Sequence, residues 1–475
     1  MINDKPFIQI FTTFNKYFLY DVNKNDCFEI TNEEKIIIDE LKEIGLKNFY
    51  NKYLHGDGIY KKMIDLISFG YFQPNYIEKI EHPLTNYCED YLDGHFRGLI
   101  LQVTQNCNLR CRYCSYSGDG NLDRKHNNKN MDFLVAKNAI DFFKIKSRKS
   151  DEVHIAFYGG EPLLNFDLIE KCINYIKINF YDKIVKFNIT TNGTIMTKHI
   201  LDVLASHDVK LTISLDGPEE IHNKNRRFAT DGQGSFSKVI TNLEFIKSEN
   251  IDYFNKLNFN AVIEMDDTFD KINLVKEFFE SSDIFTDKHN IIYSLVSDRR
   301  INRTYYQSND FAIYRKATYF KNLIEYFNHR EIGFNFGDVE DLINYKEILE
   351  YKSPLKKCAH HGGPCMPGRT RLIVDINGKL RPCEKVSEIS TNFVIGTIDE
   401  GFDINQVKKL LNIGQITEEE CKKCWAIRLC KICAEKADAV SELSPELKLE
   451  RCSIIKSVTR EKLIDIAYLK KMKVL

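Results

Sequence analysis

The sequence predicts an α/β protein: a parallel sheet with helices outside it, either open or rolled into a partial barrel, between a small N-terminal unit and a cysteine-rich C-terminal segment. Its 475 residues exceed what one hydrophobic core usually holds, which indicates two or three domains. The central part alternates strand-like apolar runs with amphipathic helical stretches. Of fourteen cysteines, three cluster near residue 110 and eight lie between residues 358 and 452.

Composition narrows the class of protein. Hydrophobic content of 43%, 28% charged residues and a net charge of -1 indicate a soluble globular chain without a basic field for nucleic acid. The apolar runs are too short for a membrane span, and residues 1–5 lack the pattern of a signal peptide. We therefore expect a cytoplasmic, reducing location, where clustered cysteines indicate metal binding or catalysis rather than disulfides.

Residues 1–90 are expected to form a small binding module. Thr31 and Glu34 predict a helix start, and the apolar face assigned to that helix is Ile36, Ile37, Ile38 and Leu41. The strands expected before it are 7–10, 17–20 and 27–30, and the helices expected after it are 46–53 and 59–69.

From residue 98 the chain alternates strand and helix. The expected strands are 98–104, 153–158, 184–190, 209–215, 256–264 and 290–296, and the expected helices are 131–146, 163–179, 197–206, 235–249 and 268–281. Residues 301–357 are expected to be a helical bridge. The segment 358–475 contains a hairpin with an Asn377-Gly378 turn, and its metal ligands are expected to replace a core that it cannot build. The domains expected are therefore 1–90, 91–300, 301–357 and 358–475.

Four polar or glycine-rich segments follow the first four of these strands: Cys107-x3-Cys111-x2-Cys114, Gly159-Gly160-Glu161-Pro162, 191–194 and 214–218. Loops after parallel strands converge at one edge of the sheet, so we expect one site. Three thiolates on a four-iron cluster leave one iron open to another ligand. A zinc site lacking its fourth ligand, or chance spacing, is the alternative. Glycines at 159 and 160 allow close approach of a ligand, and Glu161 could receive an ammonium group.

These motifs resemble the radical S-adenosylmethionine (SAM) superfamily over residues 98–300. The resemblance implies that Cys107, Cys111 and Cys114 hold a [4Fe–4S] cluster and that SAM chelates its fourth iron. It also implies that Tyr113 lies against the adenine. The other SAM-binding residues expected from the resemblance are Gly159, Gly160, Glu161 and Pro162 at the amino group, Ser214 and Arg226 at the carboxylate, and Asn192 and Asp216 in the loops beside them.

The C-terminal cysteines resemble the SPASM extension of peptide-modifying radical SAM enzymes, although paired CxxC motifs also suit zinc. The resemblance implies two auxiliary [4Fe–4S] clusters. The first would use Cys358, Cys365, Cys383 and Cys433, and the second Cys421, Cys424, Cys430 and Cys452. Only two residues separate Cys430 from Cys433, where the family usually has three, so the first auxiliary cluster could have an open iron. By resemblance Glu384 is a proton acceptor; a solvated surface carboxylate is the alternative. His360 and His361 are expected to be ordinary loop residues.

The N-terminal module resembles the winged-helix-like recognition element of peptide maturases, which binds a leader peptide by strand addition; a dimerisation or packing domain is the alternative. The whole chain thus resembles maturases of the sactipeptide and ranthipeptide type. That resemblance implies thioether crosslinking of a cysteine-containing precursor peptide by a 5′-deoxyadenosyl radical, with three [4Fe–4S] clusters, SAM and a flavodoxin- or ferredoxin-type electron donor. Alternatives are carbon–carbon crosslinking, formylglycine formation in a sulfatase, a zinc-binding peptide scaffold and an iron–sulfur redox sensor.

Overall fold

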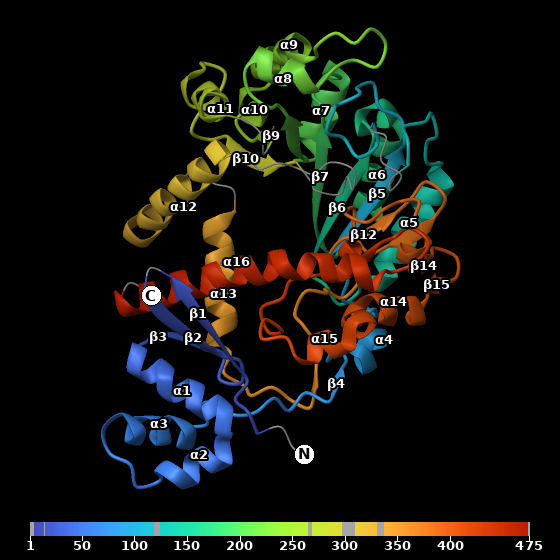
Figure 1. Cartoon of the computed structure of the whole chain (residues 1–475). Coiled ribbons are helices and arrows are strands. Elements are labelled where there is room, and N and C mark those ends of the chain that lie inside the picture. The colour runs from blue at the N-terminus through green and yellow to red at the C-terminus, as the bar shows by residue number, and fades with distance from the viewer. Residues whose placement is uncertain are drawn as a thin grey trace. The chain divides into compact units, whose positions relative to one another are not determined.

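A computed structural model describes residues 4–13, 15–117, 124–264, 268–296, 309–329 and 337–473 (Figure 1). The chain folds into two compact units. The terminal unit comprises Met1–Asn86, Gly337–Cys365 and Lys408–Leu475, and the sheet unit comprises Tyr87–Phe336 and Met366–Val407. The cysteine-rich segment that we expected to be one domain is therefore divided between the two units.

The sheet unit is built on a ten-stranded mixed sheet in the order β10-β9-β8-β7-β6-β5-β12-β13-β14-β15. Its first six strands are parallel and neighbour each other in chain order, which confirms the predicted alternation. They are β5 (Gly98–Thr104), β6 (Glu152–Gly159), β7 (Ile184–Thr191), β8 (Lys210–Ser214), β9 (Asn258–Ile263) and β10 (Asn290–Leu295).

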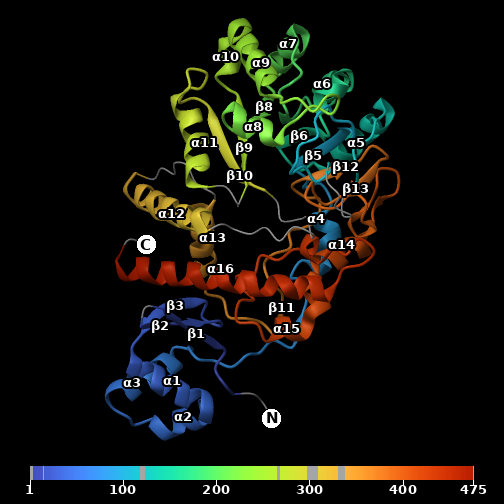
Figure 2. The same cartoon turned by 45° about the horizontal axis from the view of Figure 1, so that its top comes forward.

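Helices between these strands lie on the outer side of the sheet (Figure 2). In α5, for example, Ala136, Ala139, Ile140 and Phe143 are buried at helical spacing. The helices of this unit are α4 (Cys88–Tyr91), α5 (Phe133–Lys146), α6 (Phe166–Asn179), α7 (Lys198–Ser206), α8 (Glu219–Asn225), α9 (Phe236–Glu249), α10 (Ile251–Phe254), α11 (Phe269–Ser281) and α12 (Asn309–His329). The short helices α8 and α10 were not expected from the sequence.

The predicted hairpin is present and extends the sheet. Strand β12 (Leu372–Val374) pairs in parallel with β5, with Leu372 opposite Leu99, and β13 (Lys379–Arg381), β14 (Gly396–Thr397) and β15 (Gly401–Phe402) follow as antiparallel strands. Leu372, Val374 and Leu380 are fully buried. The hairpin is thus buried in the core of the sheet unit, because the free edge of β5 supplies both hydrogen bonds and apolar contacts.

In the terminal unit, residues 8–68 form three antiparallel strands followed by three helices, as predicted. They are β1 (Ile8–Thr13), β2 (Lys16–Asp21), β3 (Asp26–Ile30), α1 (Asn32–Ile44), α2 (Leu46–Tyr53) and α3 (Gly58–Ser68). Thr31 and Glu34 form a complete capping box at the start of α1. Ile37, Ile38 and Leu41 are buried, but Ile36 is 62% exposed, because three consecutive helical residues cannot share one face.

The remaining elements of the terminal unit are β4 (Lys79–Ile80), its parallel partner β11 (Cys358–Ala359), α13 (Asp338–Glu350), α15 (Glu418–Lys422) and the long α16 (Pro445–Lys471); α14 (Ile404–Leu411) runs across the boundary at residue 408. Helix α16 packs on the three-stranded sheet, where the rings of Phe18 and Tyr468 lie 4.9 Å apart. The next side chain along β2, Leu19, belongs to the core formed with α1–α3. Both faces of this sheet are therefore covered.

Within the described ranges, no helix combines the length and the apolar character that crossing a membrane requires.

Candidate active site

The loops after β5, β6, β7 and β8 meet at a cavity of about 260 Å³ in the sheet unit. Because the strands are parallel, their carboxyl ends lie at the same edge, as the sequence predicted. The sequence-predicted residues that line the cavity are Cys107, Cys111, Tyr113, Cys114, Gly159, Gly160, Glu161, Pro162, Asn192, Ser214 and Arg226. Of the residues predicted for this site, Asp216 alone does not line it.

The three thiols of the loop after β5 face this cavity together. All fourteen cysteines lie in the described part of the chain, and none of them forms a disulfide. Burial raises the pKa of Cys107 to about 12 and that of Cys111 to about 11, although the Arg226 guanidinium opposes the shift at Cys111. A thiol with so high a pKa ionises at neutral pH only when a metal compensates its charge. Three clustered sulfur donors beside a cavity fit an iron–sulfur cluster with one open iron.

Two glycines allow the second loop to pack against the first. A Cβ on Gly160 would lie 2.1 Å from the Asn106 carbonyl oxygen and 2.9 Å from the Cβ of Cys107. Gly159 has φ of +149°, and a Cβ there would lie 2.1 Å from the carbonyl oxygen of Thr104. The groups that approach these glycines closely are thus backbone atoms of the loop after β5, in addition to any ligand in the cavity.

Glu161 holds the second loop to the third. Its side chain is almost completely buried; one carboxylate oxygen accepts hydrogen bonds from the Thr191 hydroxyl at 2.8 Å and the Leu163 amide at 3.0 Å, and the other accepts from the Asn192 amide at 2.7 Å. Burial raises the pKa of this carboxyl. A ligand ammonium would therefore meet a carboxylate whose position is already set by three protein donors.

Asp216 does not line the cavity but contacts two residues that do. It is fully buried and accepts hydrogen bonds from the Tyr113 hydroxyl at 2.6 Å and from Arg226 Nε at 3.0 Å. The Arg226 guanidinium also lies over the Tyr113 ring, 5.4 Å from its centroid. Asp216 thus orients two residues that line the cavity, a role that chain order does not reveal.

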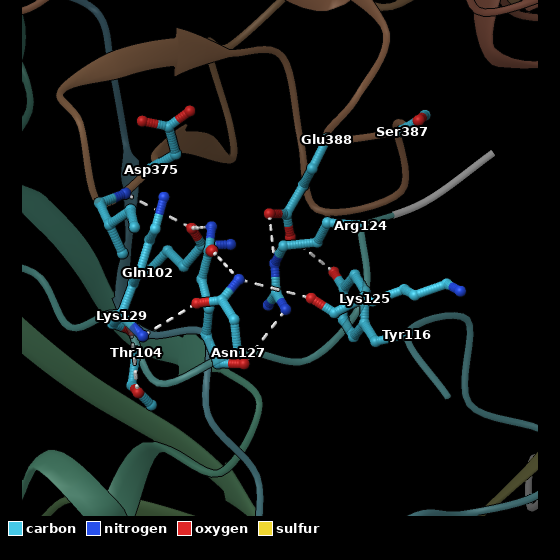
Figure 3. A network of polar contacts seen from close by, with 12 residues as sticks. Gln102, Thr104, Tyr116, Arg124, Lys125, Asn127, Lys129, Asp375, Ser387 and Glu388 are labelled. Atoms are coloured by element: carbon cyan, nitrogen blue, oxygen red, sulfur yellow. Dashed lines mark hydrogen bonds and ion pairs between the residues drawn. The ribbon is translucent and has the colours of Figure 1, made fainter. Parts of the chain in front are cut away.

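A polar network around Arg124 and Glu388 was not expected from the sequence (Figure 3). The Tyr116 hydroxyl donates to Glu388 at 2.9 Å and lies 3.2 Å from the Tyr158 hydroxyl, and both tyrosines line the cavity. Glu388 also forms a 2.6 Å ion pair with Arg124 in which both side chains are less than 10% exposed. Tyr116 follows the cysteine motif by two residues and Tyr158 directly precedes Gly159, so their positions in the sequence could have indicated both tyrosines. Nothing in the sequence indicates Arg124 and Glu388, because only the tertiary fold brings these two residues together.

Glu384 lies in the sheet unit, next to Cys383. One of its carboxylate oxygens forms a 2.7 Å ion pair with Arg371. The other oxygen is buried and has no hydrogen-bond partner among the described residues. A half-buried carboxylate with one open oxygen is not the fully solvated surface group of the alternative reading. Its predicted role as a proton acceptor stays a prediction.

The first predicted auxiliary set is distributed over both units, since Cys383 lies in one and Cys358, Cys365 and Cys433 lie in the other. Within the terminal unit, a Cβ on Gly363 would lie 2.1 Å from the Ile432 carbonyl oxygen, so the chain beside Cys365 runs against the chain beside Cys433. This set stays a prediction.

The second predicted auxiliary set lies wholly in the terminal unit. Cys421 lies on α15, Cys424 and Cys430 follow it, and Cys452 lies on α16. Burial raises the pKa of Cys424, and the thiols of Cys421 and Cys452 lie close enough to it to add to that shift. Nearby, His360 Nε2 accepts the Gly414 amide at 2.9 Å, which supports a structural role for that histidine.

Comparison with known families identifies the central region. The model of the radical SAM superfamily matches residues 101–272. These residues are a radical SAM domain. They include the three cavity thiols, the Gly159–Pro162 segment, Ser214 and Arg226.

Three curated relatives are similar to this chain. The uncharacterized protein MJ0907 of Methanocaldococcus jannaschii is 38% identical over 34% of this chain and 52% of its own length. The radical SAM cyclopropyl synthase TigE of Paramaledivibacter caminithermalis is 28% identical over 54% of this chain and 56% of its own. The chain thus spans about half the length of these two. The cysteine-type anaerobic sulfatase-maturating enzyme of Clostridium novyi is 26% identical over 70% of this chain and 86% of its own.

The fold around the radical SAM domain is also similar to that of a solved structure, native anSMEcpe with bound AdoMet. The TM-score is 0.56 at 23% identity, and the match covers 78% of this chain and 99% of the other. This chain therefore contains nearly all of that fold together with further residues of its own.

Proposed function

We propose that this protein is a radical SAM enzyme that forms thioether crosslinks, from cysteine sulfur to peptide carbon, in a ribosomally made precursor peptide. The observation that carries the radical chemistry is the cavity where three cysteines, the Gly159–Pro162 segment, Ser214 and Arg226 meet. Bound there, a [4Fe–4S] cluster and SAM would supply a 5′-deoxyadenosyl radical. Cys107, Cys111 and Cys114 would hold the cluster, and Ser214 and Arg226 would bind the SAM carboxylate.

In the proposed reaction the electrons balance: one electron enters from an external donor, and one electron leaves when the carbon–sulfur bond forms. A flavodoxin- or ferredoxin-type donor would supply one electron for the cleavage of SAM to methionine and the radical, and the radical would take a hydrogen atom from a peptide carbon. That carbon would then bond to the cysteine sulfur with loss of the thiol proton, and the remaining electron would go to the auxiliary [4Fe–4S] cluster that the C-terminal cysteines would hold. Overall, the peptide loses two hydrogens for each link. Glu384, with its open carboxylate oxygen, is the proposed acceptor of the proton.

The N-terminal module is the proposed binding site for a leader peptide. Both faces of its sheet are covered, by α1–α3 on one side and by α16 on the other, so a peptide would add at a strand edge. The winged-helix-like character of the module and its recognition role are part of this proposal. Recognition by strand addition requires only backbone hydrogen bonds along the added strand, so it suits peptides of varied sequence.

Sulfatase maturation is the second candidate, because the Clostridium novyi enzyme of that name is matched over 86% of its length. The same enzyme class would then oxidise a cysteine side chain to formylglycine without a crosslink. Similarity to a cyclopropyl synthase keeps carbon–carbon bond formation as a third outcome.

Anaerobic co-expression with the short cysteine-containing reading frame nearest the gene, followed by mass spectrometry before and after thiol alkylation, tests the proposal. We expect loss of hydrogen in pairs, with one cysteine per pair resisting alkylation, and about 12 iron atoms per chain for three clusters. Lost hydrogens with every cysteine alkylated would indicate carbon–carbon bonding instead. The C107A variant is the control, and it should leave the peptide unchanged. Colourless, zinc-containing protein would overturn the radical SAM proposal in favour of a scaffold.

A further inference from the structure

Lys448 is a buried lysine that has no carboxylate partner among the described residues. Lys448 is only 1% exposed and lies in the first turn of α16. Among the residues that the structure describes, its ammonium forms no ion pair; Nζ donates to the Thr417 hydroxyl at 2.5 Å and to Cys421 Sγ at 3.3 Å. The Thr417 hydroxyl itself lies 3.4 Å from the same sulfur.

An ammonium in such a position requires a compensating negative charge. Removing a charged group from water without a counter-ion costs several kcal/mol, so buried lysines are normally paired. The groups available to Lys448 are thiols: Cys421 in direct contact, and Cys452 on the same face of α16, whose sulfur lies 3.7 Å from the Lys448 carbonyl oxygen. Neutral thiols do not balance the charge, whereas a metal cluster held by four thiolates carries net negative charge and does.

The position of Lys448 also determines which property of a cluster it would affect. An N–H group that donates to a ligand sulfur, and a cation close to the cluster, both stabilise the more negative, reduced state. Burial strengthens this effect because no water screens the charge. Lys456, two helical turns further along α16, also acts on Cys424, but it is partly exposed, so solvent screens its charge more than that of the buried Lys448.

We propose that Lys448 is the counter-charge and sulfur hydrogen-bond donor of an iron–sulfur cluster on Cys421, Cys424, Cys430 and Cys452, and that it raises the reduction potential of this cluster. The inference rests on the four-thiolate site of the proposed function and adds the residue that tunes it. A raised potential suits a cluster that accepts an electron from a substrate radical. Lys448 acts through Cys421 and is a tuning residue rather than a catalytic one.

Redox titration followed by electron paramagnetic resonance tests this role without relying on activity. The full chain is purified anaerobically with C107A, C111A and C114A, so that auxiliary clusters alone contribute to the spectrum. C365A is added to identify the signal of the second set. In this background K448M is compared with K448R, which keeps the charge, and with K462M. Lys462 is the matched control, because it is a buried lysine of the same helix that donates to the Asp338 carbonyl at 2.9 Å.

We expect K448M to shift the potential of the second cluster to a more negative value, K448R to restore most of the shift and K462M to leave the potential unchanged. An unshifted potential in K448M, with its iron retained, would overturn the role of Lys448 while leaving the cluster intact. If K448M loses the cluster, retention in K448R supports the counter-charge role and loss in K448R overturns it. Zinc instead of iron in the starting protein would refute the cluster itself, which is a failure of the proposed function.

Discussion

Replacing Asp216 by Asn should destabilise the sheet unit strongly, because it breaks a fully buried ion pair. The Asp216 carboxylate accepts Arg226 Nε at 3.0 Å, the Tyr113 hydroxyl at 2.6 Å and the Val262 amide at 3.1 Å. In the ion pair the exposed side-chain fractions are 0% for Asp216 and 7% for Arg226. An amide of nearly the same shape keeps one acceptor but leaves the guanidinium without a counter-charge.

Removing one partner of a buried pair typically costs about 3–5 kcal/mol. In a unit of this size, 1 kcal/mol corresponds to a change in Tm of about 2–4 °C, so the expected decrease in Tm is about 6–20 °C. Because Arg226 and Tyr113 both line the cavity, D216N should also weaken SAM binding. Anaerobic calorimetry measures the first effect, and titration with SAM measures the second.

The matched control is D208N. Asp208 forms a 2.6 Å ion pair with Lys256, but the two side chains are 75% and 62% exposed. Solvent screening limits such a pair to about 0–1 kcal/mol. Equal effects of D216N and D208N on Tm would refute the reasoning. So would additivity of D216N and R226Q within about 0.5 kcal/mol in a double-mutant cycle, because directly paired residues should be coupled.

Three further predictions concern other parts of the chain. T31A removes the N-cap of α1 and should cost about 1 kcal/mol in urea unfolding of the terminal unit, followed by the fluorescence of the single tryptophan, Trp425. Burial lowers the pKa of His222 to about 4 in the folded chain, below its unfolded value near 6.5, so stability is lost as pH falls through this window; in urea unfolding across this window, H222Q should reduce the slope of the unfolding free energy by up to about 1.4 kcal/mol per pH unit. G160A places a Cβ 2.1 Å from the Asn106 carbonyl oxygen and should cost about 1–3 kcal/mol, with lower iron content in the purified protein.

Each of these three changes has a control in the chain. T31S keeps the capping hydroxyl and should restore stability, and a loss equal to that of T31A would contradict the capping role. H154Q replaces an exposed histidine and is the surface control; an equal change of slope in both histidine variants would exclude burial as the cause. A Cβ on Gly362 would lie 3.8 Å from the Arg428 carbonyl oxygen, an ordinary contact, so G362A should be tolerated, and iron loss in that variant would contradict the steric explanation.

The trace of the parallel sheet could be predicted well because its signal is local. The apolar run of β5 was expected at residues 98–104 and is found there, and the Thr31–Glu34 capping box begins α1 as predicted. The carboxyl-end loops could be expected to meet, because parallel strands leave no other arrangement. The buried face predicted for α1 wrongly included Ile36, because a run of three isoleucines does not indicate which of them faces solvent.

The sequence by itself determined the alternation of strand and helix, the cysteine spacings and the loops that carry Cys107, Cys111 and Cys114. These properties depend on side-chain type and spacing along the chain. Only the tertiary structure decided that β12 continues the sheet beside β5, that Asp216 supports Arg226 from behind, and that Lys448 is buried against Cys421. Each of these joins residues ten or more positions apart, and the burial that gives their charges importance is a property of packing, which no local pattern contains.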